Sequence, residues 1–591
     1  MRGALEKAES ALASGALIVM AVLPVTDLFL RHTTGTTIPG LSSYVQNLTL
    51  WVSFMGAMLA ARMHRHLTLT TAETAVKRLF GDRADAVRGL ISSSVCTGLF
   101  WASLQLVIVE RAGGISIAGW LPLWAVEAVM PLAFAAMIVR FTLIHPKGHL
   151  NRAIALGGVP LAALTGFLLY PYMGALFLPL FVILVLSAFV GVPIFAVLGG
   201  MALLLFFRDG VPAAAIPVET YRIVASPTIP TIPLFTLAGY VLAEGKASQR
   251  IVRLFSALFG WAPGGPAIAT VLVCTFFTTF TGASGVTILA LGGILLPVLL
   301  KCGYKKEFAI GLLTCAGSLG LLFPPSLPMI LYGVFSHTSI VEMFRAGIVP
   351  GSFMVLCVMA YSIWKSRASE VTRERFSLRE AAASLWQAKW DMGLPVVIIV
   401  GIFGGFCTLV EAAALSAVYA IAVECIIHRE MDILRELPQA VLKCATMVGG
   451  VMIIVGVAMG LAGYLVDAEI PSRAAELARE HISSKIAFLL VLNIGLLIVG
   501  CLMDIFSALV VVVPLVVPMG AAFGIEPVHL GIIFIANLEL GYMTPPVGMN
   551  LFFSSYRFEE PLTKVYLYTW PFLLLMLGTV LVITYAPLVF G

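Results

Sequence analysis

The chain has 591 residues, of which 60% are hydrophobic and only 11% are charged. A soluble domain carries roughly 25% charged residues, so this composition excludes a soluble protein and indicates one that crosses a membrane many times. The formal net charge of +5 is small for this length and does not indicate a nucleic-acid-binding surface. The nine cysteines are scattered, mostly through apolar runs, which favours small core residues over metal or redox chemistry.

A four-helix module is predicted at the amino-terminal end. A helix needs about 20 apolar residues to cross a bilayer, and the candidate spans are 13–30, 44–63, 89–110 and 118–142. We interpret the first span as a retained helix, because no small-residue cleavage motif of a signal peptide follows it. Lysines and arginines concentrate in the loops 62–88 and 140–152, whereas the alternate loops hold one arginine each. The positive-inside rule therefore places both ends of this module, including the N-terminus, in the cytoplasm.

A linking transmembrane helix is predicted over residues 151–174. Its apolar segment, 153–172, ends at the sequence Tyr170-Pro171-Tyr172. One further crossing after an even number of spans would let the next module begin on the opposite side of the membrane. We therefore expect a small scaffold module at 1–150, this linking helix, and a large module at 175–591.

The large module repeats itself. The segment "FPPSLPM" at 323–329 matches "TPPVGMN" at 544–550, with an offset of 221 residues. Two more proline pairs coincide at the same offset, Pro297 with Pro518 and Pro350 with Pro571. Chance would give about 0.2 such coincidences, so the match indicates an internal duplication. We place the two repeats at about 175–355 and 390–589.

Each repeat contains a pair of short apolar segments, 266–281 with 286–300 and 486–501 with 508–519. Lysines and arginines flank the first pair, and the segment that follows the second pair contains neither. This charge pattern predicts two re-entrant hairpins that open to opposite sides of the membrane. The predicted fold is an all-α polytopic protein with inverted repeats, an architecture typical of secondary transporters.

Four interruptions of helical structure are candidate sites for an ion and a substrate. They are Thr281–Gly285, Gly320 with Pro324-Pro325, Leu502–Ser507, and Gly541 with Thr544-Pro545-Pro546. Tandem prolines remove two amide donors and leave nearby carbonyl oxygens without helical partners. Within a membrane a bare cation can satisfy such oxygens. The alternative is that each Pro-Pro pair only kinks a helix, but four breaks in two related pairs favour a site, with sodium as the hard cation that suits hydroxyl and carbonyl oxygens.

Three acidic residues lie inside apolar segments. Asp504 falls at the second predicted hairpin tip, where it could coordinate or support an ion. Glu411 fits equally well as a site residue or as the cap of a helix beginning near Thr408. Glu127 is interpreted as an inter-helix contact. The sequence has no Walker-type phosphate loop and no His-Glu-x-x-His or Gly-x-Ser-x-Gly motif, so we expect neither ATP hydrolysis nor an enzyme.

Several motifs resemble the tripartite ATP-independent periplasmic (TRAP) transporters. The segments that look like the large membrane subunit are "GSLGLLFPPSLPMILYG" at 317–333, "FRAGIVPG" at 344–351, "TLVEAAALSAVYA" at 408–420 and "LELGYMTPPVGMNLF" at 538–552. The segment 51–69 is similar to the small subunit through Gly56, Arg62 and His66. The resemblance implies a fused protein of both subunits, as in sialic acid and C4-dicarboxylate systems.

The resemblance also implies an elevator mechanism driven by Na+, with substrate delivered by a periplasmic substrate-binding protein. It carries over one sodium site to Thr281, Ser284, Gly320, Phe323 and Pro325. Internal symmetry places a second sodium site at Asp504, Gly541, Thr544 and Pro546. The hydroxyls expected to meet the substrate are those of Ser284, Thr287 and Thr544.

The function expected from these observations is sodium-coupled uptake of a small organic acid, a carboxylate or a sialic-acid-like molecule, across the bacterial inner membrane. One alternative is an uncoupled ion channel or membrane scaffold, which the lack of a continuous polar stripe on any helix disfavours. The other is a transporter that works without a receptor, which the four-helix amino-terminal module disfavours.

Overall fold

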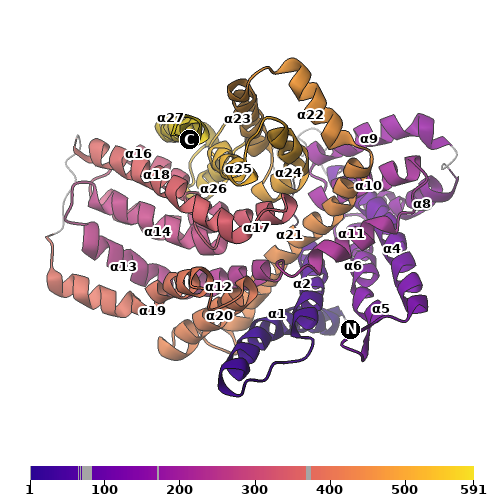
Figure 1. Ribbon diagram of the computed structural model, residues 1–591, viewed down its shortest axis with the longest axis horizontal. Helices are drawn as coiled ribbons and strands as arrows, with labels where there is room; N and C mark the ends of the chain where they lie inside the picture. The colour runs from indigo at the N-terminus through magenta and orange to yellow at the C-terminus, as the bar shows by residue number, and fades with distance from the viewer. Residues whose placement is uncertain are drawn as a thin grey trace. The chain divides into compact units, whose positions relative to one another are not determined.

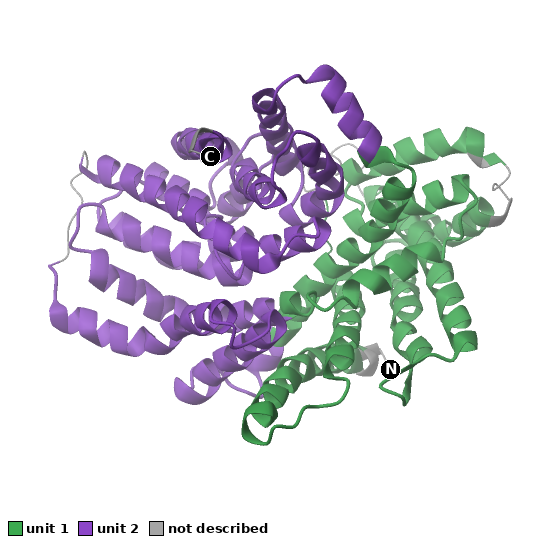
Figure 2. Cartoon of the chain, in the orientation of Figure 1, with its two compact units in different colours: residues 1–233, 441–471 green, residues 234–440, 472–591 purple. Residues whose placement is uncertain are grey.

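The computed structural model describes residues 2–63, 66, 68, 83–168, 172–367 and 375–590. The chain divides into two compact units, residues 1–233 with 441–471 and residues 234–440 with 472–591 (Figure 2). A late helix thus joins the unit formed by the beginning of the chain. The predicted module boundaries at residues 150 and 174 stay predictions, and Tyr170 and Pro171 lie outside the described residues.

Where the structure describes the first unit, it consists of helices and their connections plus one short hairpin (Figure 1). Its elements are α1 (Arg2–Thr33), α2 (Leu41–Arg62), α4 (Arg83–Gly113), β1 (Ser116–Ile117), β2 (Leu121–Pro122), α5 (Leu123–Glu127), α6 (Val129–Val139), η2 (Arg140–Ile144), α7 (His149–Leu156), α8 (Gly158–Ala163), η3 (Leu164–Leu168), α9 (Met173–Val190), α10 (Ile194–Arg208), α11 (Ala215–Val224) and, from residue 441, α21 (Glu436–Asp467). The two strands pair antiparallel, with Ser116 opposite Pro122 and Ile117 opposite Leu121.

Small residues and one buried ion pair hold the first unit together. A Cβ on Gly56 of α2 would collide with the Ala445 carbonyl of α21, so the two helix backbones touch only because glycine stands there. Arg140 pairs with the buried carboxylate of Glu9 at 2.7 Å. Arg62 reaches the same carboxylate at 3.4 Å. One carboxylate thus contacts both arginines, and further donors of Arg62 and Arg140 reach the carbonyl oxygens of Glu6 and Met58.

The second unit holds the remaining helices. They are α12 (Thr231–Glu244), α13 (Ala247–Phe259), α14 (Gly265–Thr281), α15 (Ser284–Lys301), α16 (Lys306–Ala316), α17 (Leu327–Phe335), α18 (Ile340–Arg367), α19 (Leu378–Phe403), α20 (Leu409–Ile421), η5 (Ala422–Ile427), α22 (Ile470–His481), α23 (Lys485–Leu502), α24 (Ile505–Ala522), α25 (Pro527–Gly541), α26 (Met549–Phe558) and α27 (Leu562–Phe590). Figure 1 shows α13, α14, α18 and α19 as neighbouring rows of this unit.

The element order confirms the duplication. Helices α14 to α18 recur as α23 to α27, and the second member of each pair starts 220 to 222 residues after the first. The packing is reciprocal, because α15 contacts α26 just as its counterpart α24 contacts α17. In the same way α16 contacts α27 while α25 contacts α18. Each repeat therefore completes the core of the other.

Eleven helices of the described residues are long and apolar enough to cross a membrane. They are α1, α4, α5 with α6 and η2, α15, α18, α19, α20 with η5, α21, α23, α24 and α27. Three of the four predicted hairpin arms, α15, α23 and α24, reach 18 residues and are longer than the segments expected from sequence. Length alone therefore does not separate a re-entrant arm from a crossing helix, and the re-entrant hairpins stay a prediction.

Candidate functional site

The first predicted hairpin tip is a tight turn between α14 and α15. Helix α14 ends at Thr281, Gly282 follows with a φ of +63°, and α15 begins at Ser284. Glycine is required at residue 282 because this φ is left-handed and a Cβ there would lie 2.6 Å from the Cβ of Leu327. Thr281 and Ser284 are both buried. The turn directs the amides at the start of α15 toward the break, where they can attract negative charge.

The non-helical stretch between α16 and α17, residues 317–326, packs directly on α14. The Thr278 hydroxyl donates to the Gly317 carbonyl oxygen at 2.8 Å, and the Thr279 hydroxyl donates to that of Gly320 at 3.2 Å. A Cβ on Gly320 would collide with the backbone of α14, so this approach also depends on glycine. The structure thus brings together the first hairpin and the first Gly/Pro break.

The oxygens predicted to bind the first sodium ion differ in how many hydrogen bonds they already make. The Gly320 carbonyl oxygen accepts from the Phe323 amide at 3.1 Å and has a longer contact of 3.2 Å with the Thr279 hydroxyl, whose oxygen is closer, at 2.8 Å, to the Thr275 carbonyl oxygen. The Thr281 hydroxyl has only a marginal contact, 3.5 Å from the Ala283 carbonyl oxygen. Pro325 is buried, and the Phe323 ring points toward α18. The Thr281 hydroxyl is thus less engaged than the Gly320 carbonyl oxygen, and the ligand roles at this site stay predictions.

The second pair of breaks has the same arrangement. A Cβ on Gly541 would lie 2.7 Å from the Gly500 backbone, so the end of α25 touches the end of α23. The Tyr542 hydroxyl accepts from the Ile505 amide at 2.6 Å, and the Gly548 amide donates to the Cys501 carbonyl at 3.2 Å. The stretch 542–548 is therefore fastened to the turn between α23 and α24.

The remaining ligands predicted for the second site are also partly engaged. The Asp504 carboxylate caps α24, the Thr544 hydroxyl donates to the Leu540 carbonyl at 2.9 Å, and the Pro546 carbonyl accepts from the Tyr566 hydroxyl at 2.5 Å. The carboxylate, hydroxyl and carbonyl oxygens present are the donor types that a hard cation takes. Their roles as sodium ligands stay predictions.

Comparisons with known proteins agree over nearly the whole chain. Residues 177–589 match the family described as "Tripartite ATP-independent periplasmic transporter, DctM component", and residues 20–144 match the corresponding DctQ component. The chain belongs to the TRAP transporter family. Both membrane components of a TRAP transporter are fused in it, as the sequence motifs implied, and it is a multi-pass membrane permease, not an enzyme.

Curated TRAP proteins resemble the chain at about one third identity. The isethionate TRAP transporter permease protein DctMQ of Oleidesulfovibrio alaskensis is 32% identical, with 91% of this chain and 86% of that protein covered. The C4-dicarboxylate TRAP large permease protein DctM of Pseudomonas aeruginosa is 36% identical over 66% of this chain and 91% of its own length. Among solved structures, the YdaH transporter of Alcanivorax borkumensis aligns with a TM-score of 0.46 and 13% identity, covering 62% of this chain and 89% of its own.

The sequence analysis missed one buried acid in the second unit of this TRAP protein. Glu539, in the last turn of α25, is fully buried, and neither of its carboxylate oxygens has a hydrogen-bond partner among the described residues. The available signal was an isolated acid within an apolar helix, two residues before Gly541. The equivalent residue in the first repeat, 221 positions earlier, is Ser318, which is not an acid. Internal symmetry alone therefore did not indicate Glu539.

A second missed feature is a buried charge cluster of four side chains from different elements. Arg250 of α13 forms a bidentate pair with Asp391 of α19, through contacts of 2.7 and 2.8 Å. The same guanidinium also contacts Glu424 of η5 and Glu430. One arginine thus holds three carboxylates. Because Arg250, Asp391 and the Glu424/Glu430 pair lie far apart in sequence, no local motif could indicate the cluster.

The two other acids weighed from sequence have clear surroundings. Thr408 and Glu411 form a capping box at the start of α20, with the Glu411 carboxylate accepting from the Thr408 amide at 2.8 Å. This confirms the capping interpretation of Glu411. Glu127 is buried in the first unit, and its Oε2 has no partner in the described part of the chain. Its interpretation as an inter-helix contact stays a prediction.

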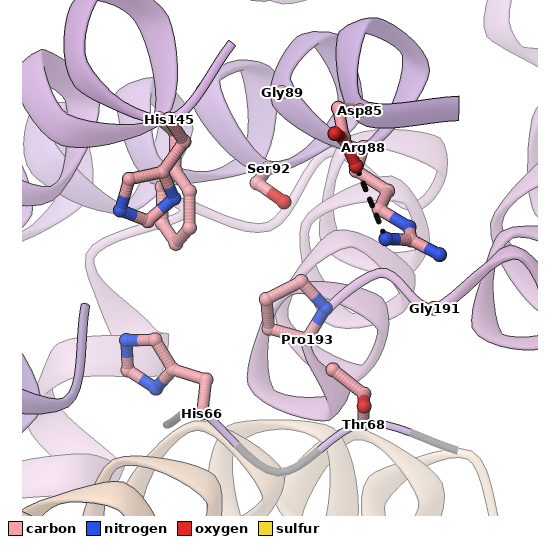
Figure 3. Close-up of a pocket in the computed structure, with 10 residues that line it drawn as sticks. His66, Thr68, Asp85, Arg88, Gly89, Ser92, His145, Gly191 and Pro193 are labelled. Carbon is pink, nitrogen blue, oxygen red and sulfur yellow. Dashed lines mark hydrogen bonds and ion pairs between the residues drawn. The ribbon is translucent and has the colours of Figure 1, made fainter. Parts of the chain in front are cut away.

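A polar cavity of about 360 Å³ lies in the first unit (Figure 3). It is lined by His66, Thr68, Asp85, Arg88, Gly89, Ser92, Phe141, His145, Gly191 and Pro193. The His66 ring packs on Phe195, with 4.9 Å between ring centroids. Burial lowers the pKa of His66 to about 3, and the nearby His145 and Arg140 contribute to the same shift. The cavity is thus bordered by a neutral imidazole.

Proposed function

We propose that this TRAP protein takes up a small organic acid across the bacterial inner membrane, with sodium as the coupling ion and a periplasmic binding protein as the source of substrate. Family membership supports transport through the membrane and a tripartite assembly. The names of relatives include permeases for isethionate, C4-dicarboxylate and 2,3-diketo-L-gulonate, which are all organic acids. The chemistry that these names share is that of a small organic anion, a sulfonate in isethionate and carboxylates in the other two, and within that class we propose a carboxylate or sialic-acid-like substrate for this chain.

The observation that carries the proposal is the pair of helix breaks packed against helix turns. The stretch 317–326 is bonded to α14, and the stretch 542–548 is bonded to the turn between α23 and α24. Each place concentrates hydroxyl and carbonyl oxygens inside an apolar unit, where uncompensated polar groups are costly. Thr281 and Ser284 in one place, and Asp504 and Thr544 in the other, would hold sodium.

The same breaks suit an anionic substrate. Helices α15, α17, α24 and α26 all begin at these interruptions, at Ser284, Leu327, Ile505 and Met549. Helix amino-termini carry partial positive charge and unpaired amides, which bind carboxylates. Ser284 is the first residue of α15, and Thr287 lies one turn later. The hydroxyl oxygens of Thr287 and Thr278 are 2.8 Å apart. With Thr544, these hydroxyls would orient the acid.

An elevator mechanism fits the reciprocal packing of the repeats. Because α15 packs on α26 and α24 packs on α17, neither repeat can move far without the other. We infer that helices α14 to α18 and α23 to α27 move as one body that carries the site across the membrane. The amino-terminal module, with its N-terminus in the cytoplasm, would remain static.

Uptake into proteoliposomes tests the coupling. The purified chain, a cognate receptor and the labelled solute identified by profiling that receptor should give uptake only with an inward sodium gradient. Equal uptake with choline in place of sodium would contradict the coupling and favour an uncoupled pathway. Equal uptake without the receptor would instead favour a receptor-independent transporter.

A further inference from the structure

The charge cluster around Arg250 contains more acids than its one cation can balance. Arg250 of α13 contacts Asp391 of α19, Glu424 of η5 and Glu430, which lies just after η5. The side chains of Asp391 and Glu424 have no exposed surface, whereas that of Glu430 is 27% exposed. With all three acids ionised, the cluster would carry a net charge of two negative units. Holding such an excess away from water is costly, so one buried acid must take up a proton or a cation.

Glu424 is the buried acid whose bonding leaves room for a proton. Both carboxylate oxygens of Asp391 are used, because they accept from Arg250 Nε at 2.7 Å and from Nη2 at 2.8 Å. Glu424 Oε1 accepts from the same Nη2, but Glu424 Oε2 is buried and has no hydrogen-bond partner among the described residues. A proton on Oε2 therefore breaks no hydrogen bond of the cluster, and Oε1 still accepts from the guanidinium.

The surroundings of Glu424 Oε2 suit a proton better than a metal ion. A Cβ on Gly245 would collide with this oxygen, so the carboxyl group lies directly against the backbone of the turn before α13. A hard cation needs several oxygen ligands around it. In the part of the chain that the structure describes, no group of three or more His, Cys, Asp or Glu side chains could hold a metal ion. A proton needs only the carboxyl oxygen itself.

The ionisable groups that act on Glu424 come from three elements. They are Arg250 of α13, Asp391 of α19 and Glu430 of the stretch after η5. Helix α14, which packs on α13, contains no charged residue. The acid of α20, Glu411, is held in its capping box at the start of that helix. The elements packed around Glu424 therefore place two acids and one arginine against it.

Other basic groups of these elements do not supply the missing positive charge. Arg253 of α13 pairs with Glu380 at the exposed surface. Lys389 of α19 lies over the Trp386 ring. The remaining candidate is His428, whose pKa is lowered by burial and by the nearby charge of the cluster's arginine. Its imidazole is therefore neutral at neutral pH and adds no counter-charge.

We propose that Glu424 is a proton-binding site that sets how tightly α13 is held to α19 and η5. On release, the carboxyl O–H bond breaks, the proton passes to a water molecule, and the electron pair remains on the carboxylate. On binding, the proton returns from a hydronium ion. The ionised group would repel Asp391 and Glu430 and compete with them for Arg250. Helix α13 would then be held less firmly.

The position of α13 gives this site a route to the transport machinery. Helix α13 precedes α14 and packs on it, and α14 ends at the first predicted hairpin tip. A change in how α13 is held would therefore act on the helix that carries this tip. The proton would act through packing, independently of the predicted sodium ligands.

Unfolding of the purified full chain in detergent tests the proposal and requires no transport. Glu424→Gln reproduces the protonated group, because glutamine has nearly the same shape, keeps an acceptor and carries no charge. A glutamate in the unfolded chain titrates near pH 4.3 or about there, so at neutral pH the native protein holds a proton that the unfolded chain has lost. Wild-type stability should therefore fall relative to Glu424→Gln as the pH rises from about 5 to about 8. The difference in unfolding temperature, variant minus wild type, should grow over this range.

Asp391→Asn is the matched variant, because Asp391 is equally buried and binds the same guanidinium. Its unfolding temperature should lie below that of the wild type at neutral pH. That difference should shrink as the pH falls toward about 4, where the unfolded aspartate takes up its proton. Infrared spectroscopy gives a second measurement. The protonated-carboxyl band of the wild type, identified by its shift in D2O, should be diminished in Glu424→Gln and retained in Asp391→Asn.

The two variants behaving alike with pH would overturn the proposal, because Glu424 would then be ionised as Asp391 is. A difference between Glu424→Gln and wild type that stays constant with pH would overturn it too, as would identical carboxyl bands. Failure of Glu424→Gln to fold would have the same meaning, since glutamine mimics the protonated acid. Failure of sodium coupling in proteoliposomes would alter none of these results, so the two proposals can fail separately.

Discussion

The Ser507 hydroxyl donates a hydrogen bond to Asp504 Oδ2 at 2.5 Å, within the first turn of α24. Asp504 Oδ1 also accepts from the backbone amides of Phe506 and Ser507, at 3.0 and 3.1 Å. The acid predicted to bind an ion is therefore, first of all, the N-cap of a helix. Its capping role and its proposed ion-binding role have to be separated by the choice of substitution.

Replacing Asp504 by alanine should lower the free energy of unfolding by about 0.5–2 kcal/mol, since the cap and its three hydrogen bonds are lost. Asparagine retains an acceptor oxygen and is an equally good N-cap, so Asp504→Asn should unfold close to wild type. Denaturation in detergent would measure both variants. Equal destabilisation by the two substitutions would show that the negative charge, and not the cap geometry, stabilises this turn.

The features of this fold that could be predicted are those set by residues close together in the sequence. The duplication and the helix pairs on either side of Gly282 and Asp504 follow from apolar runs interrupted by helix-breaking residues, and the structure has helices in those places. The capping box of Glu411 was equally readable, because Thr408 and Glu411 have the required spacing.

Contacts between distant segments were not predictable in this way. The ion pair between Arg250 and Asp391 joins residues 141 positions apart. In the sequence, each of them looks like an ordinary charged residue of a loop or a helix end. Glu539 was missed for a related reason, because the lack of partners that makes it unusual is a property of the packed core. Helix α21 joins the first unit through contacts such as that of Gly449 with Gly56, which no periodicity indicates.

Removal of Arg250 should be strongly destabilising. Arg250→Met would leave the buried carboxylate of Asp391 without a counter-charge, and breaking a buried pair in this way costs about 3–5 kcal/mol. Arg253 lies on the same helix and pairs with Glu380 at the exposed surface, at 2.7 Å. Arg253→Met is therefore the matched control, with little or no expected loss of stability, because solvent screens an exposed ion pair. Similar unfolding free energies for the two variants would contradict a stabilising role for the cluster.

Stability should decrease in acid through His66. The pKa of its imidazole is lowered by burial to about 3, whereas a histidine in the unfolded chain titrates near 6.5. The unfolded chain therefore binds a proton that the native protein does not, and stability is lost as the pH falls from about 6.5 toward 3. At a pH of about 5 the loss should approach 2 kcal/mol. His66→Phe should reduce this loss, and the exposed His481→Phe should not; equal acid sensitivity in all three proteins would refute the assignment.

The orientation of the repeats can be tested at two equivalent positions. Lys305 and Glu526 are the N-cap residues of α16 and α25, are both exposed, and lie 221 residues apart. In a background without the nine native cysteines, Lys305→Cys should react with a membrane-impermeant reagent only from the cytoplasm. Glu526→Cys should react only from the periplasm, as expected for inverted repeats. Labelling of both positions from the same side would exclude the inversion.

Sodium dependence provides the test of the sites themselves. Removing an oxygen from a sodium ligand shell weakens ion binding directly, and transport then falls through linkage between ion and substrate. Thr281→Val and Ser284→Ala in the first site, and Asp504→Asn in the second, should therefore raise the sodium concentration required for half-maximal uptake, by about 5- to 150-fold if the lost coupling is of the usual size. Thr270→Val is the matched control, because Thr270 is a buried threonine of α14 whose hydroxyl bonds within its own helix, to the Pro266 carbonyl at 2.8 Å, and to no other described residue. Unfolding in detergent must be compared first, since a lost polar contact can also loosen the turn. Stable site variants with the sodium dependence of the wild type would refute the assigned ligands, and a shift in Thr270→Val as large as theirs would show that any loss of packing in α14 produces the effect.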